Sequence, residues 1–313
     1  MDTMDFPRLT FGHYRFHFTA KSTLQLPSYT GSTWRGALGH ALRRTACVTN
    51  SQDCRGCMLS ASCAHGYLFE SPPQNSSGML ARSTAVPHPY VLRPSKGGPI
   101  TAGHTHSLDV LLFGMGNRYL PYVLHALRQA AEDGLGRERG KMALDIVEQW
   151  HDGQWQPIFS PTAPLAAKPP ATLVAPGAPE RIRVQLHTPL RLRSNNRYVG
   201  VEQFGFAHLF SALMLRLSQL ARFHGDGEPQ ADYAQLASLA REQRLIDTEL
   251  RWQDWARYSS RQRTRMQMGG LLGQFTLTGE HLSAFWPWLW LGQYSHAGKA
   301  CTMGLGQYRI DPI

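Results

Sequence analysis

The chain has no long apolar run. Its most apolar aromatic segment, FWPWLWLGQY, is too short to span a bilayer and contains a proline. The first residues, MDTMDFPRLTF, carry acids where a secretory signal would need a basic region followed by an apolar one. We therefore expect a soluble cytoplasmic protein that has no membrane partner.

Acidic residues are also scarce. The 22 Asp and Glu face 32 Lys and Arg, which gives a formal net charge of +10 and a pI near 9.6. This sign suits a protein that meets phosphate backbones, although charge alone leaves DNA, RNA and membrane surfaces open. A length of 313 residues predicts two domains, each long enough to bury a core.

Cysteine is rare, yet four of the five cysteines lie in CVTNSQDCRGCMLSASC. Cys47, Cys54, Cys57 and Cys63 have the spacing C-x6-C-x2-C-x5-C, which can close a tetrahedral metal site. In a reducing compartment this clustering favours a metal over disulfides. Structural zinc is the first candidate, an iron-sulfur cluster is the second, and a group of reduced free thiols is the alternative to both.

Strand and helix patterns follow one another in the first half in the order βαββαβ. In RLTFGHYRFHFTAK, Tyr14, Phe16 and Phe18 alternate with polar residues, which predicts a half-buried strand. GSTWRGALGHALRRTAC then has the spacing of an amphipathic helix. The predicted strands are 8–21, 88–94, 107–114 and the stretch before Trp150, and the predicted helices are 31–47 and 119–134. This is the ferredoxin-like order of elements.

The same order returns in the second half, after a stretch rich in Pro and Ala. RIRVQLHTPLRLR predicts a strand, VEQFGFAHLFSALMLRLSQLARF a buried helix, and WARYSSRQRTRMQMGGLLGQFTLTG two strands around a Gly-Gly. EHLSAFWPWLWLGQYSH predicts the second helix, and the final stretch the last strand. We predict an α+β protein with tandem ferredoxin-like (RRM-like) domains and a small Cys-rich metal-binding insertion. The predicted parts are a domain at 1–160 with its insertion at 47–66, a linker at 161–179, and a domain at 180–313 with a glycine-rich loop at 296–306.

Arginines recur at period two on several predicted strands. In YSSRQRTRMQM, Arg261, Arg263 and Arg265 would point to one surface of an extended strand. Guanidinium groups match phosphate and stack on bases, so these faces are candidates for RNA contact, whereas an ordinary exposed strand face is the alternative. Further arginines with similar spacing are Arg181, Arg183, Arg191, Arg193 and Arg197 in the second half, and Arg15 between His13 and His17 in the first.

His40 lies away from the apolar stripe of its predicted helix. It shares a face with Gly36, Gly39, Arg43 and Arg44, where small residues would let a polyanion approach closely. A histidine there can act as a general base or acid near neutral pH. A surface histidine with no role is the alternative.

The stretch SHAGKACTMGLGQYRI combines a histidine, a lysine and several glycines. It follows a predicted helix and precedes a strand, the reverse of a Walker or Rossmann loop, which disfavours a nucleotide-driven ATPase. The remaining interpretations are a backbone that lies against RNA and a loop that packs on the preceding helix. His296 is a second candidate for general acid or base, with the same alternative of a histidine without a role. Its position near Lys299 and the glycines favours the catalytic interpretation.

GSTWRGALGHALRR, the cysteine segment, YLFESP and GGLLGQFTLTG…FWPWLWLGQYSHAGKACTMGLGQYRI resemble the CRISPR-associated precursor-RNA processing endoribonucleases of the RAMP superfamily. They are most similar to the branch with a cysteine-rich insertion after the first helix. The resemblance implies two RRM-like domains that bind CRISPR repeat RNA and a cut that needs no catalytic metal. The ribose 2′-hydroxyl would attack the adjacent phosphodiester and leave a 2′,3′-cyclic phosphate and a 5′-hydroxyl.

The same resemblance suggests roles for particular residues. A family histidine in or after the first helix corresponds to His40, with His65 as the second choice. Some branches use basic residues instead, which keeps Arg35, Arg43 and Arg44 as candidates. The terminal motif implies RNA contact by four loop residues, Gly298, Lys299, Gly304 and Gly306.

We therefore predict an endoribonuclease that cuts CRISPR precursor transcripts into guide RNAs, alone or with other CRISPR effector subunits. The predicted catalytic residues are His40, His296, Lys299 and Arg43. The predicted RNA-binding residues are Arg35, Arg44, Arg261, Arg263, Arg265, Gly298, Gly304 and Gly306. A non-catalytic RAMP-type RNA-binding subunit is the alternative. A metal-containing DNA-binding protein would fit the charge and the cysteines but not the doubled βαββαβ order.

Overall fold

The structure is a computed structural model that describes residues 8–49, 54, 56–60, 62–70, 86–259 and 264–313. For residues 257–259, 264 and 265 it describes the backbone alone. Arg261 and Arg263 therefore lie outside the described residues, as does the side chain of Arg265. The chain forms two compact units, each described by itself below. The N-terminal unit consists of Leu9–Thr172 and Phe223–Asp226, and the C-terminal unit contains Leu173–Arg222 and Gly227–Ile313.

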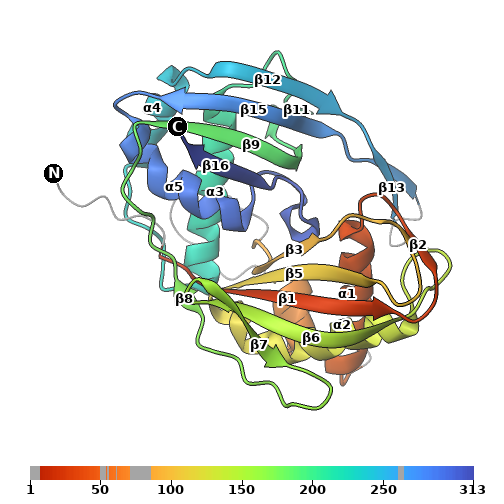
Figure 1. Ribbon diagram of the computed structural model, residues 1–313. Helices are drawn as coiled ribbons and strands as arrows, with labels where there is room; N and C mark the ends of the chain where they lie inside the picture. The colour runs from red at the N-terminus through yellow and green to blue at the C-terminus, as the bar shows by residue number, and fades with distance from the viewer. Residues whose placement is uncertain (1–7, 50–53, 55, 61, 71–85, 260–263) are drawn as a thin grey trace. The chain divides into compact units, whose positions relative to one another are not determined.

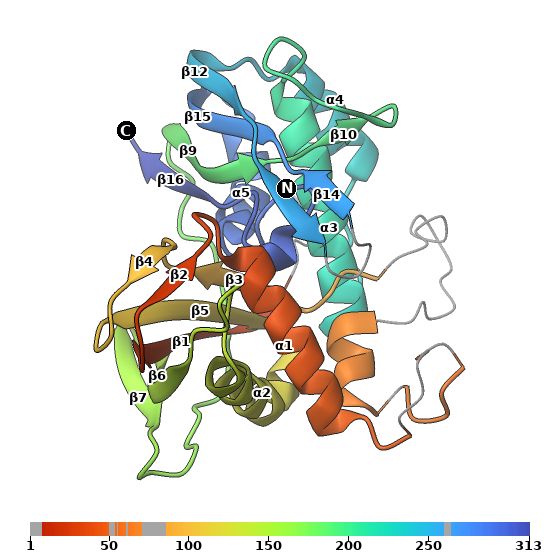
Figure 2. The ribbon, with the colours of Figure 1, turned by 90° about the vertical axis from the view of Figure 1, so that its right-hand side faces the viewer.

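The N-terminal unit is built on an antiparallel sheet with β1 (Thr10–Ala20) near its centre. The strand order is β3-β5-β1-β6-β7, and the short β8 also pairs with β1 (Figure 1). Two helices, α1 (Gly31–Ala46) and α2 (Leu120–Asp133), lie side by side on one face of this sheet (Figure 2). The other strands are β3 (Tyr90–Pro94), β5 (Thr105–Phe113), β6 (Met142–His151), β7 (Gln154–Phe159) and β8 (Ala171–Thr172). The predicted βαββαβ order is confirmed in this unit.

Alternation along β1 explains this arrangement. Tyr14, Phe16 and Phe18 are buried on the helix side, where Trp34 and Leu38 of α1 pack in the same core. The polar residues between them face the other side of the sheet. Smaller elements complete the unit: the β2–β4 pair (Leu24–Leu26 and Gly98–Ile100), the π-helical turn Gly66–Glu70 and the 3-10 turn Gly114–Tyr119.

The C-terminal unit repeats the plan with its own core. Its central strand is β9 (Arg181–Leu190) in the antiparallel order β12-β15-β9-β16 (Figure 1). The long helices α3 (Phe206–His224) and α5 (Leu282–Ser295) contribute Phe210 and Phe285 to the core beneath this sheet. The remaining strands of the sheet are β12 (Ile246–Gln253), β15 (Gly270–Thr278) and β16 (Tyr308–Pro312).

Two elements of this unit differ from the prediction. The edge partner of β15 is β12, whereas β13 (Ala256–Ser259) and β14 (Thr264–Gln267) form a separate hairpin. Most residues of β12 are exposed, but its letters, IDTELRWQ, alternate Ile246, Leu250 and Trp252 with charged or polar residues, so period two was present and the strand was overlooked. The helix α4 (Tyr233–Glu242), capped by the Asp232 carboxylate on the Gln235 amide at 2.9 Å, was also not predicted.

The stretch rich in Pro and Ala makes defined contacts. The backbone of Lys168 exchanges two hydrogen bonds with the side chain of Gln149, at 2.8 and 3.0 Å, within the N-terminal unit. Pro176 accepts a hydrogen bond from Trp286 Nε1 at 2.6 Å within the C-terminal unit. The division between the units falls between Thr172 and Leu173, inside this stretch.

None of the helices in the described part of the chain combines the length and the apolar character that crossing a membrane requires.

His106 is a buried histidine held in its neutral form by two partners. Its Nε2 accepts a hydrogen bond from Trp34 Nε1 at 3.2 Å, and its Nδ1 lies 3.0 Å from Ser95 Oγ. Burial lowers the pKa of His106 from 6.5 to about 4. A proton on Nε2 would also face the Trp34 N–H group, so the charged ring is disfavoured.

We predict that this histidine makes the N-terminal unit less stable as the pH falls from about 6.5 towards 4. The unfolded chain takes up the proton in that window while the folded chain does not, which costs at most about 3 kcal/mol. Urea denaturation at several pH values should show a shallower pH slope for His106→Gln. His104→Gln, at an exposed neighbouring position, should keep the wild-type slope, and an unchanged slope in His106→Gln would contradict the assignment.

Candidate functional site

His40 lies on the solvent side of α1, as predicted. Its side chain is exposed, and so is Gly36 one turn earlier, where an added Cβ would meet nothing within 4 Å. Gly39 has a different role, because a Cβ there would lie 2.6 Å from the Phe69 ring. The helix thus presents an imidazole beside bare backbone at Gly36 and packs against Phe69 at Gly39.

The arginines of α1 are held by different partners. The Arg35 guanidinium lies 5.1 Å from the centre of the Phe69 ring, a cation–π contact. Arg44 forms an ion pair with Asp133 at the end of α2. Arg43 is half-buried. Their roles in RNA contact stay predictions, and Arg44 would have to exchange its carboxylate partner for a phosphate.

His65 contacts α1 indirectly, through Phe69. Its ring stacks on Phe69 with centres 5.6 Å apart and planes 7° apart, and its Nδ1 lies 3.7 Å from Cys54 Sγ. Burial lowers the pKa of His65, and burial raises the pKa of the Cys54 thiol. Both groups are therefore held towards their neutral forms in this structure.

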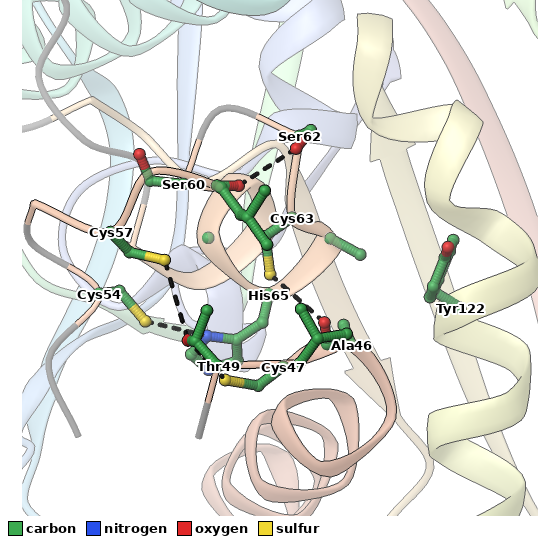
Figure 3. Close-up of a pocket in the computed structure, with 14 residues that line it drawn as sticks. Ala46, Cys47, Thr49, Cys54, Cys57, Ser60, Ser62, Cys63, His65 and Tyr122 are labelled. Atoms are coloured by element: carbon green, nitrogen blue, oxygen red, sulfur yellow. Dashed lines mark hydrogen bonds between the residues drawn. The ribbon is translucent and has the colours of Figure 1, made fainter. Parts of the chain in front are cut away.

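The four clustered cysteines line one cavity of about 170 Å³ (Figure 3). Within the described residues, no group of three His, Cys, Asp or Glu side chains is close enough together to hold a metal ion as it stands. The donor set is suited to zinc or another soft metal, since thiolates and imidazole are its preferred ligands. The metal assignment therefore stays a prediction that this donor set supports.

The basic side chains of β1 are paired with acidic residues, which corrects the interpretation of that strand as a basic face. Arg15 donates two hydrogen bonds to Asp109 on β5, at 2.7 and 2.9 Å, and His13 Nε2 lies 2.9 Å from the same carboxylate. Burial alone would raise the pKa of Asp109, but the hydrogen bonds from Arg15 and His13 outweigh it and lower the pKa to about 2. His17 pairs with Glu148 in the same way at 2.7 Å.

The glycine-rich loop of the C-terminal unit begins where α5 ends at Ser295. His296 is fully buried with a φ of 61° and a ψ of 170°, and its Nδ1 lies 3.1 Å from the Leu305 carbonyl oxygen. Ala300 also has a positive φ, of 65°. Non-glycine residues in such conformations cost about 1 to 3 kcal/mol each and persist only where the surroundings enforce them. Such strain is a reason to treat the loop as a functional element.

The loop is fixed by hydrogen bonds to Thr188 near the end of β9 and to Arg191, which follows that strand. The Lys299 amide donates to the Arg191 carbonyl at 2.9 Å. Thr188 Oγ1 donates to the Gly304 carbonyl at 2.7 Å and accepts from the Gln307 amide at 2.9 Å. The side chain of Lys299 remains exposed. The loop therefore presents a lysine from a backbone that is held on both sides.

Arg191 is not part of an exposed basic face, contrary to the prediction. It is 4% exposed, donates to the Gly269 carbonyl at 2.8 Å, and its guanidinium carbon lies 4.5 Å from the centre of the Tyr198 ring. It connects the loop to the start of β15 and to the short β10–β11 hairpin (Arg193–Ser194 and Arg197–Tyr198). Sequence reasoning missed this role because β9 ends at Leu190, after which period-two spacing no longer reports a face.

The predicted residues thus form two groups. His40, Arg35, Arg43 and the cysteine cavity belong to the N-terminal unit, and His296, Lys299 and the loop glycines belong to the C-terminal unit.

We predict that Gly298→Ala destabilises the C-terminal unit by about 1 to 3 kcal/mol. Gly298 has a φ of 80°, and an added Cβ would lie 2.3 Å from the Arg191 carbonyl oxygen. Gly227→Ala is the matched control, because Gly227 also has a positive φ but its Cβ would meet nothing within 4 Å. Hydrogen exchange of the loop amides should rise in Gly298→Ala alone, and equal effects in both variants would contradict the steric account.

Comparison with protein-family models gives two matches. The model described as CRISPR-associated endoribonuclease Cas6 matches residues 184–308, and AF_1859_N, described as an N-terminal domain, matches residues 9–171. No curated protein matches the chain.

Solved structures agree with the family match. The product complex of Thermus thermophilus Cas6 (TTHB231) has a TM-score of 0.58 and 16% identity, with 96% of this chain and 99% of that chain covered. The Cas6 (TTHA0078) product complex has a TM-score of 0.51 and 14% identity, with 97% and 99% covered.

A chain of the partial Cas6-RT-Cas1–Cas2 complex has a TM-score of 0.57 and 15% identity. The alignment covers 98% of this chain and 46% of that one, so this chain spans about half of its length. At these identities the structural likeness shows the fold alone. Residues 184–308 thus match the family of CRISPR-associated endoribonucleases named Cas6, and the chain has the fold of the Cas6 structures.

Proposed function

We propose that this protein binds CRISPR repeat RNA and cleaves the precursor transcript by attack of a ribose 2′-hydroxyl on the adjacent phosphodiester. The O2′–P bond forms as the P–O5′ bond breaks, which leaves a 2′,3′-cyclic phosphate and a 5′-hydroxyl. The 2′-hydroxyl proton passes to a base, and the departing O5′ receives a proton from an acid. Because the nucleophile belongs to the RNA, the proposed reaction needs no metal-bound water.

The position of His40 is the observation that carries this proposal. It is an exposed imidazole in the middle of the first helix, next to bare backbone at Gly36, in a chain whose residues 184–308 match the Cas6 family. An imidazole can accept or donate a proton near neutral pH. The proposal gives His40 the proton-transfer role and gives Arg43 a supporting role as a cation near the phosphorane.

The loop 296–306 has the complementary role of binding RNA. The exposed Lys299 would contact phosphate, and the half-buried backbone at Gly298 would lie against the RNA strand. Gly304 and Gly306, predicted to contact RNA as well, are buried and would support the loop from within. His296 is fully buried, and its ring nitrogen Nδ1 is hydrogen-bonded to the Leu305 carbonyl oxygen. The proposal therefore ranks His296 below His40 for proton transfer and treats it chiefly as a support of the loop.

The first test is cleavage of the cognate repeat RNA with EDTA present. We expect full activity, products that end in a 2′,3′-cyclic phosphate, and no cleavage of RNA with a 2′-deoxy substitution at the cut site. Product ends can be identified by mass spectrometry. Full-length RNA after long incubation with excess protein would instead favour the non-catalytic RNA-binding subunit.

The second test addresses His40. We expect His40→Ala to lower the single-turnover rate by roughly 10² to 10⁴ while RNA affinity changes little, because proton transfer and not binding is lost. His125→Ala is the matched control, since His125 is an exposed histidine on α2 of the same unit. A wild-type rate in His40→Ala would move the proton-transfer role to His296 or the arginines, and His296→Ala would then decide between them.

A further inference from the structure

The cavity next to the end of α1 is lined by several side chains of the types that bind metals. Cys47, Cys54, Cys57 and Cys63 all line it, together with His65 and Thr49 (Figure 3). Cys47 follows directly on α1, which ends at Ala46. The cavity is therefore joined to the helix that carries His40.

The thiols of this cavity make several long side-chain contacts. Thr49 Oγ1 lies 3.7 Å from Cys47 Sγ and 3.9 Å from Cys57 Sγ. Cys63 Sγ lies 3.8 Å from the Ala46 carbonyl oxygen, and Cys54 Sγ lies 3.7 Å from His65 Nδ1. Thiols are weak hydrogen-bond donors, so contacts of this length contribute little to holding the segment.

Large apolar side chains of the described part of this segment face solvent. Met58 is 92% exposed and Val48 is 76% exposed, although backbone hydrogen bonds such as Cys63 N to the Leu59 carbonyl at 2.8 Å order part of it. A bound metal adds stability to short hydrophilic segments of this kind. Four thiols around one cavity provide the ligands.

We propose that Cys47, Cys54, Cys57 and Cys63 bind one zinc ion as thiolates. Four S–H bonds break, four Zn–S bonds form, and four protons are released to solvent. The thiols must move towards one another to reach the metal, because no three metal-binding side chains of the described residues are close enough to hold one ion together. His65 stays outside the ligand set and donates a hydrogen bond to the Cys54 thiolate, a contact that orients the ligand.

The site acts on the first helix through His65 and Phe69. The His65 ring stacks on Phe69, and Phe69 packs against Gly39 and carries the Arg35 guanidinium. Gly39 is the neighbour of His40. Zinc bound to the four thiols would therefore fix, through His65, the aromatic ring that packs against the helix carrying His40. This role is structural and not catalytic.

Metal binding to the full-length chain tests this proposal without any measurement of cleavage, so its failure is distinct from failure of the proposed function. Reduced, metal-free protein titrated with Co²⁺ should bind one ion per chain, with thiolate charge-transfer bands and the visible spectrum of a tetrahedral site. Zn²⁺ should displace the Co²⁺ and protect four thiols from a thiol reagent. Co²⁺ binding without charge-transfer bands, or thiols that stay reactive with Zn²⁺, would overturn the proposal, as would iron with its visible absorption in the purified protein.

Matched variants separate the ligands from their neighbours. Cys54→Ser and Cys57→Ser should each weaken metal binding at least tenfold, whereas His65→Ala should keep one metal per chain and lose roughly tenfold in affinity. Cys301→Ser is the control, because Cys301 is the buried fifth cysteine in the C-terminal unit, and its metal content should equal that of the wild type. Loss of binding in His65→Ala as complete as in Cys54→Ser would overturn the four-thiolate ligand set.

Discussion

In each unit one central antiparallel strand, β1 or β9, is hydrogen-bonded to neighbours on both sides. A strand in that position sends alternate side chains to opposite faces, so one face is buried under two helices and the other is left to polar groups. The remaining elements follow from this constraint. The helix α1 packs on β1 through Trp34 and must turn His40 to solvent, and the glycine-rich loop must bring the chain from α5 to β16 beside β9.

The connection through the loop 296–306 requires strained backbone conformations. His296 and Ala300 adopt backbone conformations that side chains usually avoid. Thr188 and the backbone of Arg191 hold the loop by hydrogen bonds, and the buried Arg191 guanidinium holds the neighbouring segments in turn. Rigid elements that support a strained, partly exposed loop are a common way to build a binding site. The exposed Lys299 is then displayed on a backbone that these hydrogen bonds hold in place.

Local patterns predicted the elements that are amphipathic. The alternation of β1 and the apolar stripe of α1 are visible in the letters because each element has one buried face. The strand β12 was missed because the stretch before the Gly-Gly, which forms the β13–β14 hairpin, was taken for the partner of β15. The ion pair between Arg15 and Asp109 was missed because its partners lie on different strands. A period-two run of arginines reports which side chains share a face, but it does not report the acids across from them.

The sequence by itself determined the doubled βαββαβ order, the exposed position of His40 and the cysteine spacing, since all three depend on neighbours within one turn, one strand or one short segment. Only the tertiary structure decided which basic residues remain exposed. Arg191 and His296 are buried, whereas Lys299 faces solvent. Burial and charge pairing depend on residues far apart in the chain, and these contacts exist only once the strands and helices have packed.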